Sequence, residues 1–106
     1  MINITYKPKE FTVELNGHAG HGKKGKDIVC SAISCLFYTL AENLYECVGM
    51  LDEAPMVLDE DGSGHISCIP KKEYEPNIKL IFWCITNGMK MVAENYPKNV
   101  KFIVEE

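Results

Sequence analysis

Residues 10–30, EFTVELNGHAGHGKKGKDIVC, change their pattern twice. Residues 10–16 alternate apolar and polar side chains, a period of two that is typical of a strand with one buried face. Residues 17–25 contain four glycines in nine positions, which predicts a loop. In residues 27–48 the apolar side chains recur at steps of three and four, the spacing of a helix with one buried face. A strand, a glycine-rich loop and a long helix therefore follow one another directly.

The segments that flank this stretch complete one half of the predicted sheet. Residues 2–7 also alternate apolar and polar side chains, and the turn over residues 7–10 pairs them with residues 10–16 as a hairpin. Asp27 stands where the N-cap of the long helix belongs, and Gly49 is a natural stop. The apolar positions of this helix are Val29, Ile33, Leu36, Phe37, Leu40, Leu44, Cys47 and Val48.

The rest of the chain supplies the remaining elements. Residues 55–58 and 66–69 are predicted strands joined by a turn over 59–64, residues 77–94 are a second helix, and residues 98–106 hold a last strand. The order is ββ-α-ββ-α-β. We therefore predict a single α+β domain over residues 1–106, with two helices packed on a mostly antiparallel five-stranded sheet.

Composition excludes several classes of protein. The 106 residues are 46% hydrophobic, with a formal net charge of −4, so we expect no general nucleic-acid or membrane-surface binder. No run approaches the roughly 20 uninterrupted apolar residues of a membrane span, and the N-terminus lacks the pattern of a signal peptide. The five cysteines include no CxxC pair. We expect a cytoplasmic protein with reduced cysteines.

Cys30 is the candidate nucleophile. If Asp27 is the N-cap, Cys30 falls in the first helical turn, where backbone N–H groups lack intrahelical partners and the helix dipole is positive. That environment stabilises a thiolate, the nucleophilic form of cysteine. The same N–H groups could bind the oxyanion of a tetrahedral intermediate.

His18 is the candidate base for this thiol. It lies across the glycine-rich loop from Cys30, and a loop of this length can return a strand end to the start of the next helix. His18 could then accept the thiol proton and later protonate a leaving amine. Asp27 could cap the helix, orient the imidazole, or both. We expect the loop to be mobile in the absence of substrate, and the second loop histidine, His21, is an alternative base.

One combination of residues consists of Gly17-His18-Ala19, a glycine-containing loop, and then Asp27-Ile28-Val29-Cys30 followed by small residues and serine. It resembles the ribosomal-processing cysteine protease family, Prp. The resemblance covers most of the chain. It implies a homodimeric endopeptidase that removes a short N-terminal extension from large-subunit ribosomal protein twenty-seven. By motif position, the catalytic histidine falls on His18, the catalytic cysteine on Cys30, and the acidic residue on Asp27.

Small residues around this motif would let the backbone of an extended peptide approach. We therefore predict a substrate-binding role for Gly17, Ala19, Gly22, Gly25, Ser31 and Ser34. The expected partner is the N-terminal peptide of the ribosomal protein, and we predict no metal, cofactor, nucleic acid or membrane partner. The alternative function is a ribosome-associated module that binds the peptide without cutting it.

Other patterns in the chain support weaker interpretations. Residues 17–24 nearly spell a phosphate-binding P-loop, but Lys24 stands where the magnesium-binding hydroxyl belongs. His18, His21, Cys30 and Cys35 are the residue types that bind zinc. Cys30 and Cys35, however, are five positions apart on one helix and point to opposite sides of it, so they cannot share one metal ion. Residues 59–66 imitate the start of a calcium loop, but Pro70 replaces its final glutamate. The aromatic and methionine side chains Phe82, Trp83, Met89 and Met91 favour core or dimer interface over a cofactor pocket.

Overall fold

The computed structural model describes residues 1–23 and 27–106, and its elements follow the predicted order. The five strands are β1 (Ile2–Lys7), β2 (Thr12–Asn16), β3 (Met56–Glu60), β4 (Ser63–Ser67) and β5 (Val100–Val104). The two helices are α1 (Ile28–Glu46) and α2 (Glu75–Asn95), and short 3₁₀ turns cover Pro8–Glu10, Val48–Met50 and Lys72–Tyr74.

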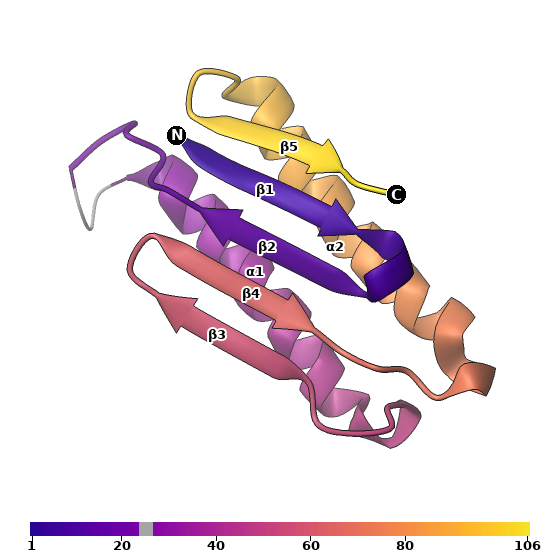
Figure 1. The fold of residues 1–106 in the computed structure, drawn as a ribbon. Coiled ribbons are helices and arrows are strands. Elements are labelled where there is room, and N and C mark those ends of the chain that lie inside the picture. Colours follow the sequence, from indigo (N-terminus) through magenta and orange to yellow (C-terminus); the bar gives the residue numbers. More distant parts are fainter. Residues whose placement is uncertain (24–26) are drawn as a thin grey trace.

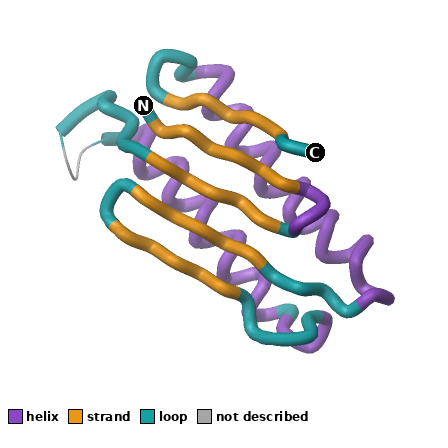
Figure 2. The backbone as a smooth tube through the Cα atoms, in the orientation of Figure 1, coloured by secondary structure: helices purple, strands orange, loops and turns teal. Residues whose placement is uncertain are grey.

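The strands form one mixed sheet in the order β3-β4-β2-β1-β5. Every neighbouring pair is antiparallel except β1 and β5, which run parallel with Ile2 beside Val100. Figures 1 and 2 show both helices on the same face of this sheet. The predicted fold class is confirmed: two helices on a mostly antiparallel five-stranded sheet.

The core lies between the helices and the sheet. Tyr6 of β1 stacks on Phe82 of α2, with ring centroids 6.0 Å apart, and Phe11 meets the same ring edge-on. Where α1 and α2 pass each other, Gly88 leaves room for Leu36, whose Cδ2 would lie 2.8 Å from an added Cβ. The largest fully buried side chains come from both layers: Ile4, Val13, Val29, Ile33, Phe37, Leu40, Leu44, Ile66, Ile78, Phe82, Met89 and Val100.

Among the described residues, α1 is long and apolar enough to cross a membrane by length and composition alone. Polar side chains interrupt it, however, and six of its residues are buried in the layer between helix and sheet: Val29, Ile33, Phe37, Leu40, Ala41 and Leu44. Packing in a core accounts for the same composition.

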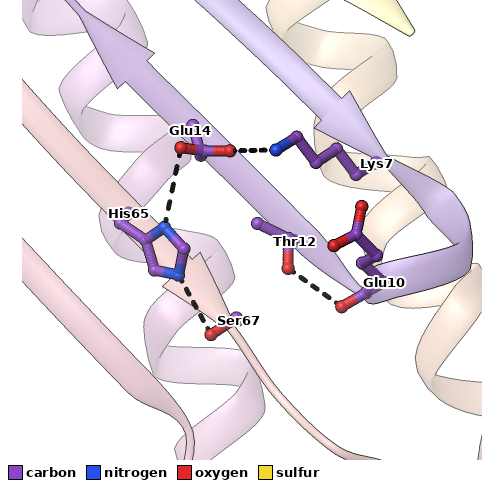
Figure 3. Close-up of polar contacts among 6 residues, drawn as sticks. All are labelled: Lys7, Glu10, Thr12, Glu14, His65 and Ser67. Carbon is purple, nitrogen blue, oxygen red and sulfur yellow. Dashed lines mark hydrogen bonds and ion pairs between the residues drawn. The ribbon is translucent and has the colours of Figure 1, made fainter. Parts of the chain in front are cut away.

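The opposite face of the sheet carries polar side chains. In Figure 3, Glu14 of β2 lies between Lys7 and His65, at 2.7 Å and 4.0 Å, and His65 contacts Ser67 at 3.1 Å. The hydrogen bond from Lys7 lowers the pKa of Glu14 and raises that of Lys7. Period-two alternation therefore gives β1, β2 and β4 polar side chains on this open face, which they share with the exposed Met56 and Leu58 of β3 and Ile103 of β5.

Several predicted boundaries were wrong, at the strands as well as the helices. β4 covers Ser63–Ser67 instead of 66–69, because the turn is only Asp61-Gly62 and Glu60 already pairs with Ser63. Helix α2 begins at Glu75 because Pro76 fits the first turn of a helix, where no N–H is needed. Helix α1 ends at Glu46, and Gly49 belongs to the 3₁₀ turn that follows.

Candidate active site

A cleft of about 690 Å³ opens at the end of the sheet where β2 leads into the glycine-rich loop. The loop, the first three turns of α1, and the turn between β3 and β4 with the adjoining strand ends line most of it, and Ile2 of β1 and Leu15 of β2 complete the lining. Predicted site residues among its lining are Gly17, His18, Gly22, Asp27, Cys30, Ser31 and Ser34. The structure thus brings most of the predicted site together in one concave surface.

Asp27 organises the start of α1. Its Oδ1 accepts hydrogen bonds from the backbone N–H groups of Val29 and Cys30, both at 3.0 Å. Asp27 is therefore the N-cap of α1, as predicted. Its Oδ2 accepts from the N–H groups of His21 and Gly22 in the loop, at 3.0 and 3.2 Å. These four donors, led by the Cys30 N–H, lower the pKa of the Asp27 carboxyl despite its burial. One carboxylate therefore joins the loop to the helix.

This arrangement corrects one expectation from the sequence. The helix-start amides were expected to remain available for an oxyanion, but Asp27 Oδ1 already occupies those of Val29 and Cys30. The Ser31 N–H donates to the Asp27 carbonyl oxygen at 3.0 Å. Capping and oxyanion binding by the same amides exclude each other, because each N–H is already satisfied.

The Cys30 thiol receives a different backbone donor. The Ala19 N–H points at Cys30 Sγ with a nitrogen-to-sulfur distance of 3.4 Å. Ala19 itself is 2% exposed, and its carbonyl oxygen accepts from Asn99 Nδ2 at 2.9 Å. A backbone N–H directed at sulfur can hydrogen-bond to a thiolate, the nucleophilic form of cysteine. Ala19 therefore contributes an amide to the site, whereas the sequence suggested only that its small size gives room to substrate.

His18 lines the same cleft but rests against its far wall. Its Nε2 lies 3.7 Å from Asp61 Oδ1 in the β3–β4 turn, and a Cβ on Gly62 would come within 3.0 Å of that nitrogen. Gly62 has φ 76° and its carbonyl oxygen accepts from the Gly17 N–H at 2.8 Å, so the turn holds the residue before His18. Over the described residues, no hydrogen bond joins His18 to Cys30.

The second loop histidine lies elsewhere. The ring of His21 meets the ring of Tyr96 edge-on, with centroids 5.2 Å apart. It is not among the residues that line the cleft. His18 lines the cleft and His21 does not, which favours His18 as the base.

The loop is anchored along much of its described part. Gly17, Ala19, His21 and Gly22 each donate a backbone hydrogen bond to the β3–β4 turn, to Cys30 or to Asp27. Gly17 has φ 97°, and a side chain there would clash with the Met1 carbonyl oxygen, so only glycine fits. Gly25 lies outside the described residues, and the mobility expected for the loop stays a prediction.

Sequence reasoning missed the wall opposite α1. Asp59, Glu60, Asp61 and Gly62 line the cleft, and Tyr38 of α1 donates a hydrogen bond to Asp59 that raises the pKa of the Tyr38 phenol. The signal available in the sequence was the Asp61-Gly62 dipeptide, a strong hairpin turn. It could not show that β4 pairs with β2 and so brings this turn beside Gly17.

The structure also bears on the phosphate, metal and cofactor sites considered from the sequence. Asp27 already supplies an anion at the start of α1, where a P-loop would hold phosphate. The segment that imitates the start of a calcium loop is a turn between paired strands, as predicted, and the turn itself is only two residues long. Within residues 1–23 and 27–106, no three His, Cys, Asp or Glu side chains are grouped to hold a metal. On α2, Phe82 and Met89 are core residues, while Trp83 and Met91 are exposed.

The remaining cysteines differ from Cys30 in their surroundings. Burial raises the pKa of the Cys68 thiol to about 11, which keeps it protonated and unreactive at neutral pH. Cys35 and Cys84 are exposed on the helices, and Cys47 is half-buried. Of the five, Cys30 is the one that faces the cleft.

Comparison with known proteins identifies the family. The model of the family "Cysteine protease Prp" matches residues 1–101. The chain belongs to the Prp family of cysteine proteases. Among Prp relatives, the ribosomal processing cysteine protease of Staphylococcus aureus is 25% identical over 94% of this chain and 92% of its own. That of Mycoplasma genitalium is 29% identical over 93% and 89%.

Solved structures of Prp share the fold. The S. aureus Prp protease in complex with a covalently linked product peptide superposes with a TM-score of 0.80 at 24% identity, over 99% of this chain and all of that one. The same protease in complex with a substrate peptide gives a TM-score of 0.69 at 23% identity, over 98% and 97%. A Streptococcus mutans protein gives 0.67 at 27% identity, over 97% and 90%.

Substitutions at Asp27 should separate its two roles. Asp27→Ala removes the cap and both loop bonds and should cost about 2 kcal/mol of unfolding free energy at pH 7. Asp27→Asn should cost less, because asparagine caps helices well but its amide group cannot accept from both sides. Urea unfolding of the three proteins should give free energies of unfolding that decrease in the order wild type, Asp27→Asn, Asp27→Ala.

The pH dependence of this effect has a defined sign. The folded state lowers the pKa of Asp27, so the wild-type advantage over Asp27→Asn should be full above about pH 4 and fade as the pH falls through the lowered pKa. Equal unfolding free energies of wild type and Asp27→Asn at pH 7 would contradict the bridging role.

Proposed function

We propose that this protein is an endopeptidase that removes the N-terminal extension of large-subunit ribosomal protein twenty-seven. Cys30 is the nucleophile and His18 the general base. The observation that carries the proposal is the placement of Cys30 at the start of α1, facing the cleft that His18 also lines, with the Ala19 N–H on its sulfur. The names of the Prp relatives, ribosomal processing cysteine proteases, support the class of substrate.

In this proposal the reaction proceeds through an acyl-enzyme. His18 takes the proton of the Cys30 thiol, and the sulfur attacks the scissile carbonyl carbon to give a tetrahedral intermediate. The carbon–nitrogen bond then breaks, His18 protonates the departing amine, and a thioester remains on Cys30. A water molecule, deprotonated by His18, attacks the thioester and frees the new carboxylate and the thiol.

His18 has to change position for the first step. Its imidazole lies beside Asp61, and catalysis requires Nε2 or Nδ1 to come within hydrogen-bond reach of Cys30 Sγ. We propose that a bound peptide displaces the imidazole from the β3–β4 turn toward Cys30. Gly17, Gly22, Ser31 and Ser34 line the cleft with small side chains and leave room for that peptide.

The reaction would take place in the cytoplasm, where ribosomes are assembled.

Cleavage of the extended ribosomal protein by purified variants tests the roles of Cys30 and His18 directly. Cys30→Ala should abolish cleavage, and His18→Ala should slow it by about 10²–10⁴-fold, the usual contribution of a general base. Cys35→Ala and His21→Ala are the matched controls and should cleave at close to the wild-type rate, because neither residue lines the cleft.

Cleavage by Cys30→Ala at the wild-type rate would overturn the proposal. Wild-type protein that binds the extended substrate but leaves it intact would instead support the peptide-binding module without protease activity.

We also propose that the protein acts as a homodimer through the outer face of α2. Leu80, Trp83 and Met91 are 58%, 58% and 63% exposed, and their spacing places them on one side of the helix. A second copy of the chain would bury this apolar stripe. Sedimentation equilibrium should give twice the mass of the chain for wild type and a single chain for Trp83→Asp.

The control is Leu58→Asp, which changes an equally exposed apolar residue on β3 and should remain dimeric. A monomeric wild type, or a Leu58→Asp variant that alone loses the dimer, would contradict this interface.

A further inference from the structure

The corner between α2 and β5 lies far from the catalytic motif in sequence but contacts its loop. Asn99 Nδ2 donates to the Ala19 carbonyl oxygen at 2.9 Å across 80 positions of the chain. Three residues earlier, the ring of Tyr96 packs edge-on against His21. Two side chains of this corner thus contact the loop, and of the two it is Asn99 that makes a hydrogen bond to it.

The corner itself is rigidly hydrogen-bonded. The Tyr96 carbonyl oxygen accepts from the N–H groups of Asn99 and Val100, at 2.9 and 3.0 Å. The Asn99 carbonyl oxygen accepts from the Ile2 N–H at 2.8 Å, which ties the corner to the first residue of β1. Val100 is 2% exposed and begins β5. The Asn99 backbone is therefore fixed before its side chain reaches the loop.

Ala19 connects this corner to the candidate nucleophile. Its carbonyl oxygen is held by Asn99, and its N–H donates to Cys30 Sγ at 3.4 Å. The two neighbours of Ala19 in the chain differ in their surroundings. His18, before it, lines the cleft, and Gly20, after it, has a left-handed backbone with φ 66°. The Ala19 carbonyl and the Ala19 N–H belong to different peptide groups, which meet at the Ala19 Cα atom. Asn99 therefore acts on the N–H through the backbone angles of Ala19, and the burial of this residue, at 2% exposed, restricts how far those angles can change.

We infer that Asn99 is a positioning residue for the protease reaction: it holds Ala19 so that the Ala19 N–H stays on the sulfur of Cys30. The side-chain amide donates to a carbonyl that can only accept, so the NH₂ group, and not the amide oxygen, does the holding. Asn99 does not line the cleft, and it acts on Cys30 only through Ala19. This inference rests on the proposed role of Cys30.

Alkylation of Cys30 by iodoacetamide, measured against pH and assigned by peptide mass spectrometry, reports the sulfur directly. In Asn99→Ala the Ala19 carbonyl loses its donor, so the N–H is no longer held on the sulfur and the alkylation profile should move to higher pH. In the cleavage assay kcat should fall about tenfold with KM little changed, since the peptide cleft is untouched. Asn99→Gln keeps a donor and should lie closer to wild type than Asn99→Ala.

Asn95→Ala is the matched control. Asn95 makes an equivalent side-chain bond, to the Met91 carbonyl oxygen at 2.8 Å, but on the exposed surface of α2. It should change neither the alkylation profile nor kcat. Urea unfolding of every variant separates a loss of folded protein from a change at the sulfur.

An unchanged alkylation profile in Asn99→Ala, or equal shifts in the Ala and Gln variants, would overturn the inference. Failure of the proposed function has a different signature. If Cys30→Ala still cleaves while Asn99→Ala moves the alkylation profile of Cys30, the geometry around Asn99 stands and the catalytic role of Cys30 falls.

Discussion

The carboxylate of Asp27 is the interaction on which the site depends. It accepts two N–H groups from the start of α1 and two from the loop that leads back to β2. A glycine-rich loop alone would have many conformations, and fixing each residue costs about 1–2 kcal/mol in entropy. A buried carboxylate that satisfies four donors offsets much of that cost locally. Asp27 therefore fixes the part of the loop at His21 and Gly22 relative to the start of α1.

This constraint also decides which chemistry the start of α1 can perform. The N-terminus of a helix attracts anions, and here the anion is part of the chain. An external phosphate would have to displace Asp27, and an oxyanion cannot use amides that Asp27 occupies. What reaches Cys30 instead is the Ala19 N–H, brought in by the same loop and held from behind by Asn99. The chain belongs to the Prp family of cysteine proteases, and Cys30 is the cysteine that lines this cleft.

Sequence reasoning succeeded where the signal is local. The N-cap at Asp27, the first-turn position of Cys30 and the alternation of β1 each depend on residues close together in the sequence, and the structure confirms all three. The contribution of the β3–β4 turn was missed because it depends on the pairing of β4 with β2, and no periodicity encodes which strands become neighbours. Asn99 was missed for the same reason: it meets Ala19 only after β5 has joined β1. The competition between capping and oxyanion binding was foreseeable, because both roles draw on the same few amides.

Amide hydrogen exchange at four residues tests this account most directly. In the wild type, the N–H groups of His21, Gly22, Val29 and Cys30 should all be protected, because each donates to Asp27. In Asp27→Asn, exchange at His21 and Gly22 should accelerate by about tenfold or more, the effect of losing one hydrogen bond, while Val29 and Cys30 stay protected by the remaining cap. Unchanged protection of His21 and Gly22 would contradict the claim that one carboxylate holds the loop to the helix.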